Sequence, residues 1–480
     1  MRFLITKLII ISAKVRFILA LWFSKTARIL MRMLGQNATF LPGVIALKLC
    51  PNFIKYIGKP KTLISITGTN GKTTTINLIC DALEAMGERI ISNRFGTNVE
   101  AGIAVTLMNG STIFGQCKYD IGVFETDERS VKRIYPVKPP THIVITNLFR
   151  DSIARNAHPA YIADFLTDAI PSQSHLILNA DDPISSRVAP DNTRVYFGIK
   201  ELPTDIKECI NLINDLRICP MCSGKLEYEY RRYHHIGKYK CMDCEFNAPD
   251  YDYIADDVDF NTMTMRVSDK DGHGNYNLMS DSIFNVYNML TAISLLRELG
   301  KTHYKISNTM ASLNILSSRY NEQKAGNVKI IMQMAKQRNA LAVSRAFDYI
   351  SSKPGDKQIL LMMNCQTDGK NWSENPCWMY DCDFEFLNKP DITKIITTGY
   401  RYKDLYLRSL FAGIPKDKLF RVRDELDAVK LFDYSKESNI YILYGTDSFN
   451  LAKKVQAKII DFADVYANKH YVYANSEVNV

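Results

Sequence analysis

Runs of apolar residues separated by polar turns alternate with helical patterns over most of the chain. The short runs that predict strands lie at 63–67, 121–124, 142–145 and 175–178. The helical patterns lie at 72–87, 158–169, 282–299 and 303–317. Short apolar strands that alternate with helices are typical of a mostly parallel, doubly wound sheet. The first two thirds of the chain therefore predict an α/β fold.

The last third of the chain repeats this alternation as a separate α/β unit. Its predicted strands lie at 359–363, 392–397 and 439–443, and its predicted helices at 401–412, 424–432 and 446–465. A chain of 480 residues is too long for one ordinary core, so several domains are expected. We predict an N-terminal helical segment at 1–52, a central domain at 53–317 with a cysteine-rich insert at 215–250, and a C-terminal domain at 318–480.

The N-terminal segment is strongly apolar over residues 3–23, but Lys7, Lys14 and Arg16 interrupt it. A membrane-spanning helix needs about 20 residues with few or no charges, and no small-residue cleavage site of a signal peptide follows. The pattern predicts an amphipathic helix with Lys and Arg on one face. Such a helix either packs on the domain that follows it or lies on a membrane surface, and the two are compatible.

Composition limits the function classes. The chain is 46% hydrophobic, which is typical of a folded protein. Its net charge is +9, and its Lys and Arg residues form no dense tract. This charge suits an acidic substrate or an anionic membrane surface and gives no argument for nucleic acid. Seven of the eleven cysteines lie in apolar or mixed surroundings, which favours a reduced, cytoplasmic protein, with attachment at the inner face of the membrane as the alternative.

The strongest chemical signal is the glycine-bracketed loop after the strand at 63–67. Glycine lets the backbone approach a phosphate, and the N–H groups at a helix start point at it. Lys72 is placed to reach the outer phosphates and the Thr73 hydroxyl to bind Mg²⁺, although Ile66 stands where the standard loop has its first glycine. A Gly-x-x-Gly alone marks only a turn, but Lys-Thr-Thr behind a strand favours ATP. The predicted ATP-binding residues are Gly68, Thr69, Asn70, Gly71, Lys72, Thr73 and Thr74.

Polar side chains follow three further strands of the predicted sheet. Glu125 follows the strand at 121–124 and is the predicted Mg²⁺ ligand, with Glu128 as the second candidate. Without the phosphate loop, this segment would be interpreted as a solvated acidic turn. Asn147 and Asp182 follow the next two strands. Because ligands bind at the carboxyl ends of parallel strands, these residues are expected to meet in one crevice.

Asn285 and Asn288 lie at the start of the predicted helix at 282–299. Residues three apart share one face of a helix, so both side chains are expected to point the same way. They either contact the adenine or ribose of the nucleotide or cap the helix.

Four cysteines form two C-x₂-C pairs separated by eighteen residues: Cys219, Cys222, Cys241 and Cys244. Two such pairs close a tetrahedral four-cysteine site around Zn²⁺. Four thiolates leave no open position, so the predicted zinc is structural. His234 and His235 lie between the pairs and are predicted to be surface residues of the ribbon.

The phosphate loop, the segments at 146–151, 179–183 and 284–288, and the cysteine insert together resemble the Mur ligase family. The resemblance runs over nearly the whole chain and continues at 378–385 and 398–401. Ordinary Mur ligases and folylpolyglutamate synthases lack the cysteine insert. The chain is therefore most similar to the branch of ligase-like subunits that work with a separate glutaminase.

The resemblance implies an ATP- and Mg²⁺-dependent carbon–nitrogen ligase of peptidoglycan synthesis. In this branch, ATP phosphorylates the α-carboxyl of D-glutamate in the stem peptide of lipid II, and ammonia from the glutaminase converts the acyl phosphate to D-isoglutamine. Lys72 and Glu125 match the phosphoryl-transfer residues. Asp381 matches the aspartate that completes the catalytic triad of the glutaminase, with Asp368 as the rival; otherwise Asp381 is a helix cap or a surface acid.

Three segments depart from the family pattern, at 318–322, 336–340 and 368–381, which face the substrate and the domain hinge in the family. Two alternatives therefore stand beside the amidating subunit. One is a stand-alone amino-acid ligase. The other is a nucleotide-binding scaffold that has lost its chemistry and recruits cell-wall enzymes.

Overall fold

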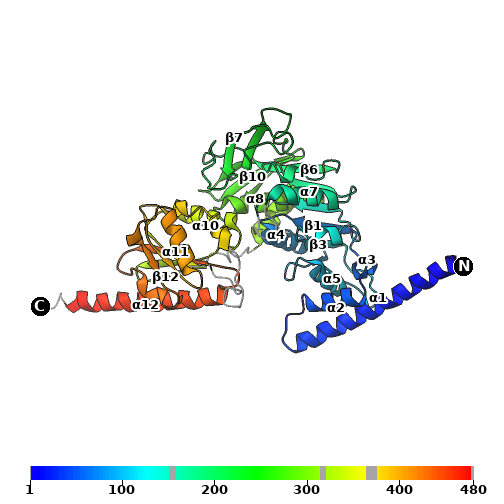
Figure 1. Cartoon of the computed structure of the whole chain (residues 1–480), viewed down its shortest axis with the longest axis horizontal. Helices are drawn as coiled ribbons and strands as arrows, with labels where there is room; N and C mark the ends of the chain where they lie inside the picture. The colour runs from blue at the N-terminus through cyan, green and yellow to red at the C-terminus, as the bar shows by residue number, and fades with distance from the viewer. Residues whose placement is uncertain (1, 151–157, 314–320, 364–375, 477–480) are drawn as a thin grey trace. The chain divides into compact units, whose positions relative to one another are not determined.

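The computed structural model describes residues 2–150, 158–313, 321–363 and 376–476. The chain forms two compact units. The first contains residues 1–149, 158–210 and 214–314, and the second contains residues 150–157, 211–213 and 315–480. Each unit has its own sheet and its own core (Figure 1).

Unit 1 is built on a nine-stranded sheet with the order β11-β10-β9-β6-β5-β4-β1-β3-β2. Its strands are β1 Thr62–Thr67, β2 Ile90–Ser92, β3 Ile121–Glu125, β4 His142–Ile145, β5 His175–Asn179, β6 Arg194–Ile199, β9 Tyr253–Asp259, β10 Thr264–Asp269 and β11 Gly272–Asn277. Along this sheet order, neighbouring strands from β2 through β6 to β9 pair in parallel. Strand β10 pairs antiparallel with both β9 and β11. The predicted mostly parallel α/β sheet is confirmed.

Helices pack along this sheet and bury its central strands, which explains their continuous apolar runs. The helices are α2 Leu41–Leu49, α3 Phe53–Tyr56, α4 Lys72–Ala85, α5 Glu100–Asn109, α6 Val131–Ile134, α7 Pro159–Ala169, α8 Ile283–Glu298 and α9 His303–Ser312. Those predicted at 72–87, 158–169 and 282–299 are present. The helix predicted to end at 317 ends at Ser312, and residues 314–320 lie outside the described residues.

The N-terminal segment forms one long helix, α1 Arg2–Met33, which runs beside α2 at one border of unit 1 (Figure 1). Phe17, Ala20, Leu21 and Ser24 are buried on the side of α1 that packs against this unit. The predicted packing on the domain that follows is therefore confirmed. Across the residues that the structure describes, none of the helices has the length and hydrophobicity that a membrane crossing requires.

The cysteine-rich insert contains a separate antiparallel hairpin, β7 Leu226–Tyr233 and β8 Ile236–Cys241. The side chain of Arg232, near its tip, is buried, and its guanidinium lies 3.1 Å from Asp181 Oδ2 and 2.7 Å from Asp205 Oδ2. Burial alone would lower the pKa of Arg232, but the acidic side chains around it raise it well above its usual value. The hairpin is thus joined to the sheet by a buried ion-pair cluster just beyond the end of β5.

Unit 2 contains a six-stranded sheet with the order β12-β13-β17-β14-β15-β16, parallel except for β12. Its strands are β12 Asn321–Ala325, β13 Val328–Met334, β14 Lys357–Met362, β15 Ile392–Thr397, β16 Leu419–Arg421 and β17 Ser438–Tyr444, and its helices are α10 Ala340–Ser352, α11 Tyr402–Phe411 and α12 Phe449–Ser476. The three predicted strands and the predicted helix at 401–412 are present.

The prediction of a helix at 424–432 is wrong, because only a short 3₁₀ turn, Ala428–Leu431, forms there. The Asp424 side chain accepts a hydrogen bond from the Leu426 N–H at 2.7 Å. Such an Asx turn competes with the first turn of an α-helix for the same backbone groups.

We predict that Arg232→Ala destabilises the protein by about 3–5 kcal/mol, because it leaves two buried carboxylates without their cation. Denaturant unfolding of the purified chain measures this change. Lys238→Ala is the matched control, since its ion pair with Glu229 on the same hairpin is about half exposed, and a change within about 0.5 kcal/mol is expected. Equal stabilities of the two variants would contradict the account.

Candidate functional site

The loop between β1 and α4 has the backbone that the sequence predicts for a phosphate loop. Gly68 and Gly71 have φ of +120° and +86°, a left-handed region that favours glycine. A Cβ on Gly71 would overlap the Asn288 side-chain oxygen, and one on Gly68 would overlap Thr146. Gly71 is also the N-cap residue of α4, so the first N–H groups of this helix face the loop. Both glycines are therefore required by the geometry.

Lys72, the first residue of α4, is buried and folds back over the loop. Its ammonium donates to the Gly68 carbonyl and lies 2.8 Å from Glu128 Oε1. Glu128 is also buried, so this ion pair is shielded from water. Glu128, the second candidate for the Mg²⁺ ligand, thus contacts the lysine of the loop.

Glu125 ends β3 directly beside the start of α4. Its Oε2 accepts a hydrogen bond from the Thr73 hydroxyl at 2.9 Å, and its Oε1 accepts one from the Asn98 amide at 2.9 Å. Asn93 holds the backbone of Glu125 through two hydrogen bonds of 2.8 Å. The carboxylate and the hydroxyl together offer the hard oxygen ligands that Mg²⁺ prefers.

Asn93 and Asn98 were missed by the sequence reasoning. Asn93 directly follows β2, a three-residue strand too short to be recognised from its pattern. The one sequence signal for a role of Asn93 in the site is its position at the end of another strand.

Asn147 contacts the phosphate loop itself. The Asn70 N–H donates to Asn147 Oδ1 at 3.1 Å, and the Asn147 amide donates to the Asn70 carbonyl at 3.1 Å. The Thr146 hydroxyl donates to the same carbonyl at 2.7 Å. The end of β4 therefore fixes the conformation of the loop.

Asp182 is fully buried beyond the end of β5. Its Oδ2 accepts from the Leu148 N–H at 2.7 Å, and its Oδ1 accepts from the Ile184 N–H at 2.9 Å. These bonds place Asp182 under the segment after β4, where it holds the backbone next to Asn147.

Asn285 and Asn288 share one face of α8, as predicted, and the Asn288 amide donates to Asn285 Oδ1 at 3.4 Å. The N-cap position of α8 is occupied by Ser282, and the Asn285 amide donates to Ser280 Oγ at 2.5 Å. Asn288 lies against Gly71. The pair therefore borders the phosphate loop.

The four predicted cysteines come together. Their sulfur atoms all lie within 4.8 Å of one another, with Cys219–Cys244 at 3.7 Å and Cys222–Cys241 at 3.5 Å. A tetrahedron with Zn–S bonds of about 2.3 Å has S–S edges of about 3.8 Å. The N–H groups of Met221, Gly224 and Asp243 donate to three of the sulfurs at 3.4 Å, which stabilises thiolates. The residues present fit a structural zinc ion.

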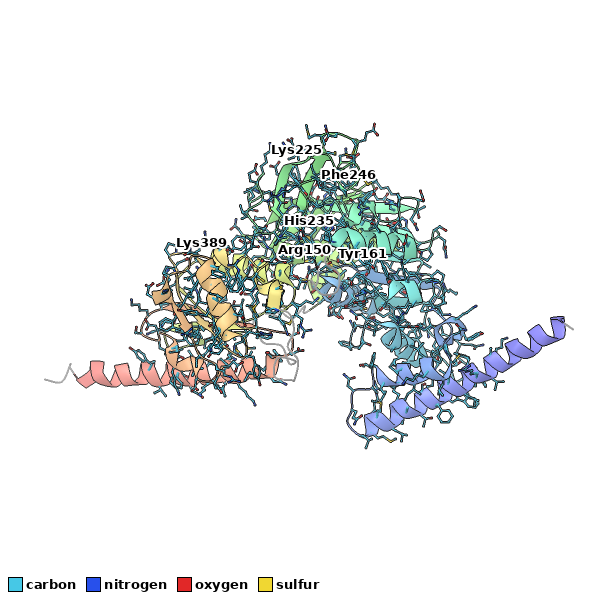
Figure 2. The ribbon with its side chains drawn as sticks, viewed as in Figure 1. Arg150, Tyr161, Lys225, His235, Phe246 and Lys389 are labelled. Atoms are coloured by element: carbon cyan, nitrogen blue, oxygen red, sulfur yellow. The ribbon has the colours of Figure 1, made fainter. Side chains whose placement is uncertain are left out.

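The prediction that His234 and His235 are surface residues is wrong, because both are buried. The hairpin turn inserts them among the residues that follow β4, and the His235 ring stacks on Phe149 with centroids 4.2 Å apart. In Figure 2, Lys225 marks the end of the hairpin near the cysteines and His235 the opposite end. The alternating buried tyrosines of β7, including Tyr228 and Tyr230, are the sequence signal for this burial.

Asp381 lies in unit 2, in a turn between two short 3₁₀ segments, Pro376–Met379 and Phe384–Leu387. It is partly exposed, and its carboxylate lies 3.7 Å from Arg150 of the same unit. The rival candidate, Asp368, lies outside the described residues.

Of the segments that depart from the family pattern, the one at 336–340 is described in full. Asn339 caps α10, accepting a hydrogen bond from the Ala342 N–H at 2.9 Å. Gln337 accepts one from the Thr446 N–H at 2.7 Å. This departure therefore forms ordered structure at the carboxyl edge of the second sheet.

Comparisons with known proteins agree with these observations. Residues 66–217 match the Mur ligase middle domain, and residues 337–446 match the MurT ligase C-terminal domain. Among solved structures, a pseudomurein peptide ligase type C from Methanothermus fervidus is similar, with a TM-score of 0.64, 22% identity and coverage of 85% of this chain and 81% of that one. MurF from Acinetobacter baumannii has a TM-score of 0.60 at 14% identity, covering 87% and 80%. These structures show the fold.

Two relatives match this chain over most of its length. The lipid II isoglutaminyl synthase (glutamine-hydrolyzing) subunit MurT of Staphylococcus aureus is 32% identical over 400 residues, which is 82% of this chain and 88% of that protein. The protein of the same name from Streptococcus pneumoniae is 27% identical, over 88% of this chain and 93% of its own length. The chain therefore belongs to the Mur ligase family of ATP-dependent ligases and, within it, to the MurT subunits.

Proposed function

We propose that this protein amidates the α-carboxyl of D-glutamate in the stem peptide of lipid II, using ATP and ammonia from a partner glutaminase. The observation that carries the proposal is the phosphate loop with its adjoining Thr73–Glu125 pair, in a chain whose second unit matches the MurT C-terminal domain. The names of the relatives supply the substrate class.

The first step activates the carboxylate. The loop N–H groups at the start of α4 and the Lys72 ammonium bind the phosphates, and Thr73 and Glu125 would hold Mg²⁺, which neutralises charge on the transferring phosphoryl group. An oxygen of the substrate carboxylate attacks the γ-phosphorus, and ADP leaves. The product is an acyl phosphate, whose carbonyl carbon is open to nucleophiles.

In the second step, ammonia attacks that carbonyl carbon, the C–O bond to phosphate breaks, and the nitrogen loses a proton. Glu128 acts as a positioning residue here, because its ion pair holds the Lys72 ammonium over the loop. Asn147 and Asp182 position the loop, and Asn285 and Asn288 border the nucleotide-binding region.

We propose a GatD-like glutaminase as the partner. Asp381 would accept a hydrogen bond from the catalytic histidine of that subunit, fixing its tautomer and stabilising the imidazolium. Its partial exposure in a surface turn of unit 2 supports this role. The zinc ion that the four cysteines fit would be structural and take no part in the chemistry.

A complete set of phosphate-loop, carboxylate and strand-end residues argues against the scaffold alternative. The match of residues 337–446 to a MurT C-terminal domain argues against a stand-alone amino-acid ligase. The relatives of this chain act on lipid II, which is linked to the membrane. The proposed location of the protein is therefore the cytoplasm, at the inner face of the membrane.

The direct test is amidation of lipid II by the co-purified ligase and glutaminase, with ATP, Mg²⁺ and glutamine, detected by mass spectrometry. We predict that Lys72→Ala lowers the rate about 100-fold or more, because it removes a charge that stabilises the transferring phosphoryl group. Lys61→Ala, an exposed lysine just before β1, is the control and is expected to retain full rate. Full activity of Lys72→Ala, or no amidation by wild type with glutamine or ammonium, would refute the proposal.

Asp381→Asn is predicted to separate the two half-reactions. Glutamine-dependent amidation falls about 100-fold or more, since the histidine of the partner loses its orienting carboxylate, while amidation with ammonium stays unchanged. Asp417→Asn, an exposed aspartate of the same unit, is the control. Equal loss with both nitrogen donors would show that Asp381 serves the ligase reaction or the fold instead.

Metal analysis of the purified chain is predicted to give one zinc ion per molecule. Cys241→Ser removes it and lowers the melting temperature, because metal binding contributes to folding of the ribbon. Cys117→Ser, outside the cluster, leaves the zinc content unchanged. A metal-free wild-type protein with Cys219 and its neighbours joined in disulfides would overturn the assignment.

A further inference from the structure

The outward side of α1 is apolar as well as its packed side. The exposed apolar residues lie opposite Phe17 and Leu21, and six of them form what we call the α1 outer stripe: Val15, Leu19, Trp22, Phe23, Ile29 and Leu30. Each is between 45% and 66% exposed. A continuous apolar stripe of this length on a protein surface marks a site of interaction.

A neighbouring loop extends this apolar surface. The Trp22 indole N–H donates to the Ile113 carbonyl at 2.8 Å, and Lys25 donates to the Ser111 carbonyl at 2.8 Å. These bonds hold the loop at 111–117 beside α1. The side chains at its tip, Ile113 and Phe114, are 59% and 65% exposed. Two separate segments thus present apolar side chains next to each other.

The charged side chains of α1 all have the same sign. Residues 1–80 contain no Asp or Glu, and residues 1–61 contain eleven Lys and Arg, more than the net charge of +9 of the whole chain. Lys14, Lys25, Arg28 and Arg32 follow one flank of the stripe at helical spacing. Burial and the neighbouring cations Lys118 and Arg28 lower the pKa of Lys25, as expected where positive charges lie together.

Two occupants fit an apolar stripe on a helix, and the charges distinguish them. The stripe follows the 4-3 spacing of a coiled coil, so a second copy of α1 is one candidate. Pairing of two copies would bring only Lys and Arg together at the flanks, where coiled coils place opposite charges. An anionic bilayer supplies both the negative charge and the apolar interior.

We propose that the α1 outer stripe and the loop at 111–117 bind the surface of a bilayer that contains anionic lipids. The helix lies in the plane of the interface, its apolar residues enter the headgroup boundary, and its basic flank contacts the lipid phosphates. The inference uses residues of unit 1 alone and does not depend on the amidation reaction, although it would bring the site to a lipid-linked substrate.

Co-sedimentation of the full-length protein with vesicles tests this proposal. Wild type is expected to bind vesicles in which about a third of the lipid is phosphatidylglycerol, to bind pure phosphatidylcholine at least about tenfold more weakly, and to be released by high salt. Equal binding to both vesicle types, or no binding to either, would overturn the proposal.

Two double variants locate the surface. Leu19→Gln with Phe23→Gln weakens binding by about tenfold or more through lost apolar contact, and Lys14→Gln with Arg32→Gln does so through lost charge. The control for the apolar variant is Tyr161→Gln with Tyr304→Gln, which are exposed apolar residues of α7 and α9. The control for the charge variant is Lys416→Gln with Lys436→Gln, which are exposed lysines of unit 2. Both controls are expected to bind like wild type.

All substituted side chains are exposed, so circular dichroism and melting temperatures should match wild type. Undiminished vesicle binding by the Leu19/Phe23 variant or by the Lys14/Arg32 variant would contradict the proposal. A wild-type dimer in sedimentation equilibrium that dissociates in Leu19→Gln with Phe23→Gln would assign the stripe to a second copy and also overturn it. Amidation of a detergent-solubilised substrate measures the reaction separately from vesicle binding. The variants are expected to amidate this substrate at the wild-type rate.

Discussion

The fixed backbone of the loop from Gly68 to Gly71 is the constraint on which the candidate site depends. Two left-handed glycines allow the turn, and Asn147 holds it through a reciprocal pair of hydrogen bonds with Asn70. Because the loop is held from the neighbouring strand, the first N–H groups of α4 are oriented before any phosphate arrives. Preorganised donors of this kind need no rearrangement when charge develops on a phosphoryl group.

The second contribution to the site comes from the cysteine-rich insert. Its hairpin tip is held by the Arg232 cluster and by His235, which stacks on Phe149. The Phe149 N–H donates to the Thr69 hydroxyl at 2.9 Å, so the hairpin and the phosphate loop share one packed cluster. A zinc ion in the four-cysteine site at one end of the ribbon would stabilise an element whose other end packs beside the phosphate loop.

The sequence predicted the elements whose signals are local. The phosphate loop, the C-x₂-C pairs and the strands at 63–67 and 121–124 carry dense short-range patterns, and the structure contains all of them. Strands β9 to β11 were missed because their residues are largely polar and few of them are buried, so no apolar run marks these strands. The burial of His234 and His235 depends on tertiary contacts with Phe149, and the alternating tyrosines of β7 are the one local signal that accompanies it.

In the proposed reaction, this loop activates a carboxylate by phosphorylation before nitrogen is added. Isotope transfer tests it most directly. If the α-carboxyl of the substrate carries ¹⁸O, attack of its oxygen on the γ-phosphorus and later cleavage of the C–O bond must leave one ¹⁸O in the released phosphate. The labelled phosphate is expected to appear in step with amide formation. Amidation that releases unlabelled phosphate would contradict this reaction.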